Sequence, residues 1–176
     1  MAGHNKWSKI KHKKAVEDSK KSKVFSNYSQ AIALEAKRAQ GNKNDPGLKA
    51  VIDRARAANM PMTNIDRAIA KGTNAQSSEL EEVTYEGYGP GGVALMIISI
   101  TDNRNRTTPE IKHLLNKNGG SLGEPGSTAW AFTKTDGVSE PITTIPLNDA
   151  DQEKLADLKE KLEDHPDVNE VITNAS

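Results

Sequence analysis

The chain has 176 residues, of which 24 are basic and 24 are acidic, a size and composition that suit one or two small folded domains. The zero net charge hides a split: residues 1–75 carry 16 basic and 6 acidic side chains, and residues 76–176 carry 8 and 18, which suggests a polyanion-binding part and a separate acidic part. The absence of cysteine excludes disulfides and thiolate chemistry. No apolar run approaches the roughly 20 residues that a membrane span needs, and no apolar stretch follows the basic N-terminal residues as it would in a secretory signal. We therefore expect a cytoplasmic protein.

Residues 1–75 are predicted to form a bundle of three short helices. The first twelve or so residues look flexible, and a helix is expected from about Lys13 to about Gln40, where apolar residues recur at three- and four-residue spacing. Asp45 and Pro46 have the pattern of a cap and first-turn proline for a second helix. A third helix is expected from about Pro61 to about Lys71.

Residues 76–176 are predicted to form an α+β domain in the order β-β-α-β-β-α-β, after a polar linker over residues 73–82. The pattern places helices on one face of a mainly antiparallel sheet, as in an α/β sandwich. A Thr-Thr-Pro-Glu capping-box pattern starts the first helix at Thr107, and Asn148 caps the second. The expected strands cover residues 83–88, 93–101, 127–132, 139–147 (an edge strand, because of its prolines) and 168–173.

The N-terminal segment is the main candidate for function. Residues 1–23 hold eight lysines and only two acidic residues, and lysines that meet phosphates release counterions and bind strongly at low salt. Trp7 could stack on a base or insert at a groove; the alternative is a solvated terminus whose tryptophan packs on the bundle. Because lysine outnumbers arginine here, we expect phosphate contact with weak base selectivity.

Two sets of arginines are weaker candidates. Arg54, Arg56 and Arg67 either widen the basic surface or are ordinary outer-face charges paired with Asp53 or Asp66. Arg104 and Arg106 lie beside asparagines just before the expected helix at Thr107, which is a natural anion site or simply loop and capping chemistry.

Other motifs argue against an enzyme. The glycine-rich residues 85–92 lie between two strands and lack the Lys-Ser/Thr of a phosphate-binding loop. Residues 119–123, GGSLG, match the letters of a serine nucleophile elbow, but a helix precedes Ser121 and a strand follows it, the reverse of the elbow. The four histidines have no metal-ligand spacing. We therefore expect no catalytic residue, metal, cofactor or small-molecule substrate.

Several segments resemble, in one order, the YebC/PmpR family. They are MAGHNKWSKIKHKKA, AANMPMTNIDRAIAKGT, YEGYGPGGVALMI, TDNRNRT and NKNGGSLGEPGSTAWAF, and the tail from residue 143 is also similar. Bacterial members of this family are described as probable transcriptional regulators. A mitochondrial relative is a translational activator of cytochrome c oxidase synthesis, and bacterial relatives have also been tied to ribosome function.

The resemblance implies an N-terminal helical domain and two α/β domains, the last inserted into the second. This chain lacks most of that inserted domain near residues 135–140, so we expect two domains, a basic one over 1–75 and an acidic one over 76–176. Asn27 and Gln30 stand where the family is more basic on the first helix, a departure that could weaken nucleic-acid contact.

Residues and resemblance together predict a non-enzymatic DNA-binding transcriptional regulator. The alternative is a ribosome-associated translation factor that binds ribosomal RNA. The expected partners are DNA, ribosomal RNA or both, with the ribosome as a further candidate partner, and no membrane. The predicted nucleic-acid-binding residues are Lys6, Trp7, Lys9, Lys11, His12, Lys13, Lys14, Lys20, Lys21 and Lys23, followed by Arg104 and Arg106.

Overall fold

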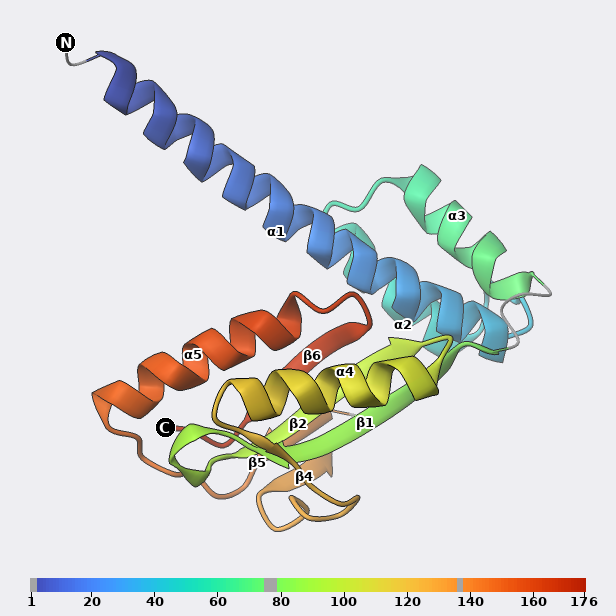
Figure 1. Ribbon diagram of the computed structural model, residues 1–176. Helices are drawn as coiled ribbons and strands as arrows, with labels where there is room; N and C mark the ends of the chain where they lie inside the picture. The colour runs from blue at the N-terminus through green and yellow to red at the C-terminus, as the bar shows by residue number, and fades with distance from the viewer. Residues whose placement is uncertain (1–2, 75–78, 136–137) are drawn as a thin grey trace. The chain divides into compact units, whose positions relative to one another are not determined.

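The computed structural model describes residues 3–74, 79–135 and 138–176, and of residues 3–10, 12 and 138 it describes the backbone only (Figure 1). The chain divides into two compact units, residues 1–78 and 79–176. The expected linker over residues 73–82 falls partly outside the described residues, at 75–78, and its last two residues begin a strand instead.

The first unit contains three helices, α1 (Gly3–Arg38), α2 (Pro46–Ala57) and α3 (Met62–Thr73). Asp45 caps α2 as predicted, because its carboxylate accepts hydrogen bonds from the backbone N–H groups of Gly47 and Leu48 at 2.9 and 3.1 Å. The core lies between the C-terminal half of α1 and the two shorter helices. It is built from Ile32, Ala36, Leu48, Val51, Ala55, Met60, Ile65, Ala68 and Ile69.

Two predictions for this unit were wrong. The segment expected to be flexible is helical from Gly3, and α1 is a single helix of 36 residues rather than a short one. Its N-terminal half runs beyond α2 and α3 (Figure 1), and every side chain from residue 13 to residue 22 is exposed. A helix with no buried face depends on its own residue propensities and charge pairs, so this half is held as helix without help from a core.

The C-terminal half of α1 and α3 approach each other closely at Gly72. A Cβ atom at this position would lie 2.1 Å from the carbonyl oxygen of Ala33 in α1. Only glycine permits this distance between the two backbones. Gly72 lies one residue before the end of α3, and its lack of a side chain allows this packing against α1.

The second unit is α+β, as predicted. Its central sheet has the strand order β3-β1-β2-β6, and all its neighbouring strands are antiparallel. A separate antiparallel pair is formed by β4 and β5. The elements are β1 (Glu81–Tyr88), β2 (Ala94–Thr101), α4 (Arg104–Lys117), β3 (Ser121–Leu122), β4 (Phe132–Thr135), β5 (Val138–Pro141), α5 (Asp149–Glu163) and β6 (Val168–Thr173).

The sheet has a different cover on each face. Alternating strand residues such as Leu95 and Ile97 pack with Leu115 of α4 and Leu158 of α5 in the main core. The residues between them face a smaller cluster in which Ala94 contacts Ala131 and Phe132. The helices α4 and α5 therefore cover one face, as expected, and the segment leading into β4 covers part of the other.

Several elements in this unit differ from the prediction. The short strand β3 was not expected, so the order is β-β-α-β-β-β-α-β, and the strand expected over residues 139–147 is β5, which ends at Pro141. Residues 127–131 form turns rather than a strand, and only Phe132 of the expected strand belongs to β4. The helix α4 begins at Arg104, not Thr107, because Asn103 is its cap and accepts a hydrogen bond from the N–H of Arg106 at 3.2 Å. Both arginines of the expected anion site therefore lie inside the first helical turn.

A carboxylate fixes the turns that lead into β4. Glu86 of β1 accepts hydrogen bonds from the N–H groups of Gly126 and Thr128 at 2.7 and 2.8 Å, and from the Thr128 hydroxyl at 2.6 Å. Partial burial raises the pKa of Glu86, but these hydrogen bonds outweigh it and the pKa is lowered overall.

Candidate nucleic-acid interface

The predicted nucleic-acid-binding residues of the first segment all belong to α1. Lys6, Trp7, Lys9 and His12 are placed there by the backbone. Five lysines have described and exposed side chains: Lys11, Lys13, Lys14, Lys20 and Lys21. Lys23 is half-buried, at the point where the helix meets its core. All the predicted residues of this segment therefore lie on one continuous helix.

The charges of the five exposed lysines of α1 are not neutralised by other described side chains. None of these five takes part in an ion pair with another described side chain; Lys21 lies 5.8 Å from the centre of the Phe25 ring, a cation–π distance. Glu17 and Asp18 are the acidic residues in this half of the helix, and both are exposed. The N-terminal half of α1 is consequently a strongly positive, solvent-facing helix.

The three arginines of α2 and α3 are exposed, and of the two alternatives for them the pairing with Asp53 or Asp66 is not found among the described side chains. Asp66 forms an ion pair with Lys43 at 3.5 Å rather than with Arg67. Arg56 donates a hydrogen bond to the sulfur of Met62 at 3.3 Å. Among the described side chains neither Asp53 nor Asp66 neutralises one of these arginines, which leaves them available as additional positive charge on the first unit.

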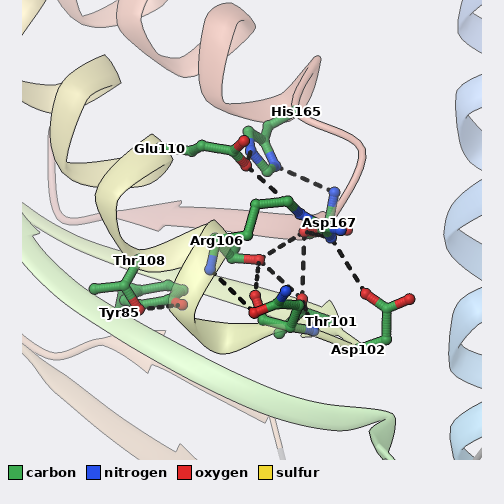
Figure 2. Close-up of polar contacts among 10 residues, drawn as sticks. Tyr85, Thr101, Asp102, Arg106, Thr108, Glu110, His165 and Asp167 are labelled. Carbon is green, nitrogen blue, oxygen red and sulfur yellow. Dashed lines mark hydrogen bonds and ion pairs between the residues drawn. The ribbon is translucent and has the colours of Figure 1, made fainter.

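Arg104 and Arg106 have different surroundings, although they are two residues apart. Arg104 is exposed and has no ion pair among the described residues. The guanidinium of Arg106 contacts Asp167 at 2.8 Å, Asp102 at 3.3 Å and Glu110 at 3.9 Å (Figure 2). The hydrogen bond and charge of Asp167 raise the pKa of Arg106. The charge of Arg106 is therefore balanced within the protein.

Asp167 is the centre of this polar cluster. Its buried Oδ2 atom accepts hydrogen bonds from Arg106 and from the hydroxyls of Thr107 and Thr101, the latter two at 2.7 and 3.3 Å (Figure 2). Burial by itself raises the pKa of Asp167, but the hydrogen bonds from Thr107 and Arg106 outweigh it and lower the pKa overall. The cluster joins the end of β2, the first turns of α4 and the residue before β6.

Three residues of the cluster also have the chemistry of metal ligands. Ligand atoms of Glu110, His165 and Asp167 lie within 4.8 Å of one another. Their atoms have protein partners, however: His165 Nε2 is 3.0 Å from Glu110, His165 Nδ1 accepts the N–H of Asp167, and Asp167 binds Arg106. A cation here would have to compete with the Arg106 guanidinium, so the geometry fits an ion-pair cluster that joins secondary structure elements.

Sequence reasoning missed this cluster. The sequence predicted no role for His165 or Asp167. The residues that bind Asp167 lie about 60 positions earlier in the chain. Nothing in their spacing signals the contact, because it depends on how β2 and β6 pair.

The remaining motifs have structural roles. Ser121 lies in β3, pairs with Tyr88 and is exposed, and it follows α4, so it does not form the strand–turn–helix of a nucleophile elbow. The glycine-rich residues after β1 form a short 3-10 turn between two strands. None of the helices in the described part of the chain has the length and apolar character needed to cross a bilayer.

The structure defines an α+β protein of two units, one of which bears a basic, exposed helix. Comparisons with known proteins identify it further. Residues 5–75 match the model of the TACO1/YebC protein N-terminal domain, and residues 80–139 match the TACO1/YebC second and third domain. The chain belongs to the TACO1/YebC family.

Curated relatives align with nearly the whole chain. A "probable transcriptional regulatory protein" of Fervidobacterium nodosum is 44% identical over 174 residues, which cover 98% of this chain and 68% of the relative. A second "probable transcriptional regulatory protein", from Dictyoglomus thermophilum, is 38% identical over 237 aligned positions, which cover 99% of this chain and 95% of the relative. The second alignment is longer than this chain of 176 residues, so that relative contains internal sequence that this chain lacks.

A solved structure supports the fold. The crystal structure of a conserved hypothetical protein from Aquifex aeolicus matches with a TM-score of 0.77 and 30% identity, covering 88% of this chain and 90% of that one. The resemblance to the family is confirmed by the family models and by the relatives, and the solved structure supports the α+β fold.

Proposed function

We propose that this protein is a non-enzymatic regulator that binds DNA through the N-terminal half of α1 and acts on transcription. The observation that carries the proposal is the run of exposed lysines on a helix segment that no core covers. The names of the relatives, which describe probable transcriptional regulatory proteins, support a regulatory role.

The chemistry of binding follows from the residue types. Each lysine that meets a phosphate releases condensed counterions, so affinity falls steeply as salt rises. A lysine ammonium is a point charge without the forked geometry that reads guanine, so these contacts fix position more than sequence. We propose Lys6, Lys9, Lys11, Lys13, Lys14, Lys20, Lys21 and Lys23 as phosphate contacts, with Trp7 and His12 beside the bases or sugars.

The arginines and the second unit have distinct proposed roles. Arg104 is a secondary phosphate contact, because its charge is exposed, whereas Arg106 mainly holds the Asp167 cluster together. The acidic excess of residues 76–176 repels polyanions, which directs DNA to α1 and leaves the second unit for a protein partner. We also propose that the family's inserted domain is missing near residues 135–140, between β4 and β5.

The proposal is tested by the salt dependence of binding to a labelled DNA duplex of mixed sequence. We compare the intact chain with a variant in which Lys13, Lys14, Lys20 and Lys21 are changed to Gln. Loss of four phosphate contacts should reduce the slope of log affinity against log salt by roughly four.

A matched control removes the same charge elsewhere. It changes four exposed lysines of the second unit to Gln: Lys112, Lys117, Lys134 and Lys154. The control should leave the slope nearly unchanged. Equal slopes for all three proteins would show that α1 is not the interface, and the same conclusion would follow if deletion of residues 1–14 left the affinity unaltered.

A further inference from the structure

The outer face of α5 carries a row of acidic side chains. They recur at four- and three-residue spacing, on the side of the helix opposite its buried leucines, and all are exposed: Asp149, Glu153, Asp157, Glu160 and Asp164. Like charges four residues apart, such as those of Asp149 and Glu153, destabilise a helix. A cationic partner on this face would therefore relieve repulsion that is built into α5.

The lysines of α5 leave most of this row unpaired. Lys154 and Lys159 form ion pairs with acidic residues that lie outside the row. Lys161 pairs with one member of the row, Asp157. The other members have no ion pair among the described side chains, so the outer face of α5 is strongly negative.

The chain itself contains a helix of complementary charge. Lys13 and Lys20 of α1 are exposed and seven residues apart, and neither has an ion pair among the described side chains. Glu153 and Glu160 of α5 have the same seven-residue separation. Seven residues of α-helix rise about 10.5 Å, so two helices lying side by side in either direction bring the lysines opposite the glutamates.

The surroundings of these two lysines favour such a contact. At about 100° of rotation per residue, Glu17 projects beside Lys13 and Lys20, whereas Asp18 projects from nearly the opposite side of α1. The apolar side chains next to the lysines are exposed as well, Val16 by 48% and Val24 by 42%. Burial of these valines against a second helix would add a hydrophobic contribution to the charge pairing.

We infer that the outer face of α5 is a docking surface for the N-terminal half of α1 of a second copy of this chain, with Lys13 and Lys20 opposite Glu153 and Glu160. A second copy is the occupant because every copy presents both faces, one positive and one negative, at the same concentration. The contact itself goes beyond the proposed function, and one consequence rests on that function. DNA and the second copy compete for the same lysines, so self-association reduces the amount of α1 that is free to bind DNA.

The contact is tested by reversing the charge of one face at a time. The first variant combines Glu153→Lys with Glu160→Lys, and the second combines Lys13→Glu with Lys20→Glu. At low salt the sedimentation coefficient of the intact protein should rise with protein concentration, and added salt should abolish the rise by screening. Each variant alone should need roughly tenfold more protein to associate, because like charges then meet. An equimolar mixture of the two variants should regain association, since the lysines of each then meet the glutamates of the other.

A matched control reverses two exposed acidic residues of the second unit outside α5, Glu124→Lys with Glu140→Lys. It makes the same change in net charge as the α5 variant and should associate as the intact protein does, and circular dichroism verifies the fold of every variant. Three results would each overturn the docking of a second copy. They are an intact protein that stays monomeric at every concentration, a control that loses as much association as the α5 variant, and a mixture that does not regain association.

The same proteins separate the docking surface from the proposed function. A DNA duplex of mixed sequence should disperse the assemblies of the intact protein, because its phosphates take up the lysines of α1. Duplex that binds the assemblies without dispersing them would overturn the pairing through Lys13 and Lys20. Association without affinity for DNA would defeat the proposed function and leave the docking surface standing, and affinity for DNA in a protein that stays monomeric would do the reverse.

Discussion

The negative charge of Asp167 should stabilise the folded second unit. Replacing Asp167 with Asn keeps an oxygen that can accept hydrogen bonds from Thr101 and Thr107, but it removes the negative charge that pairs with Arg106. Asp167 is 9% exposed, whereas Asp102, which contacts the same guanidinium at 3.3 Å, is 64% exposed. Because both carboxylates pair with Arg106, comparing their Asn variants shows how much burial adds to the stabilising effect of the ion pair.

The size of the effect follows from the hydrogen bonds that change. A hydrogen bond to a charged group contributes about 1.5–3 kcal/mol and a neutral one about 1 kcal/mol. Because Arg106 is partly exposed, we expect Asp167→Asn to lower the free energy of unfolding by about 2 kcal/mol. Asp102→Asn should cost less than about 0.5 kcal/mol, as exposed ion pairs contribute little. For a unit of this size, 2 kcal/mol corresponds to a fall in Tm of about 8–16 °C.

The assay is urea unfolding followed by the fluorescence of Trp130 in a Trp7→Phe background, so that the signal reports the second unit. The pKa of Asp167 is lower in the folded protein than the ordinary value of about 3.9, so its ionised form stabilises the fold at higher pH. The difference between the parent and Asp167→Asn should thus be complete near pH 7 and shrink as the pH falls below about 4. Equal costs for the two variants, or a difference independent of pH, would refute this reasoning.

Three further predictions concern packing and capping. Gly72→Ala should destabilise the first unit by about 2–3 kcal/mol, because its Cβ would press on the Ala33 carbonyl oxygen. Ala70→Gly in the same helix should cost only about 1 kcal/mol, and equal losses in thermal unfolding would contradict the close approach. Glu86→Gln should speed hydrogen exchange of the Gly126 and Thr128 amides, because it weakens the hydrogen bonds that these amides donate to Glu86. The loss of stability should be confined to pH above about 4, where Glu86 is ionised, and unchanged exchange would show that the carboxylate does not hold these turns. Asn148→Ala should cost about 1 kcal/mol through loss of the α5 cap, measured by urea unfolding, with no such loss for Asn116→Ala.

Local patterns predicted the parts of the fold that depend on local chemistry. The caps Asp45 and Asn148 and the final strand were found because cap geometry and strand alternation are properties of a few neighbouring residues. The start of α1 was missed because residues 3–22 have no apolar stripe, so hydrophobic periodicity gives no signal there, although lysine, alanine and glutamate favour helix.

Competition between neighbouring signals explains other errors. A capping-box pattern at Thr107 suggested a helix start, but Asn103 supplies the cap three residues before Arg106. The expected strand over residues 127–132 alternates plausibly, yet Glu86 holds its first residues in turns. Both outcomes depend on which hydrogen bonds form in the folded chain, and the local sequence does not determine this. The Asp167 cluster could not be predicted at all, since it is created by the pairing of strands far apart in sequence.

The proposal that the N-terminal half of α1 binds DNA is tested most directly by a competition experiment. The intact protein is bound to labelled duplex DNA at near-physiological salt, and purified ribosomes or unlabelled duplex of equal phosphate content are then added. The account predicts that ribosomes displace the protein no better than duplex does. Displacement by ribosomes at far lower concentration would contradict it and would assign the lysine-rich helix to ribosomal RNA and translation.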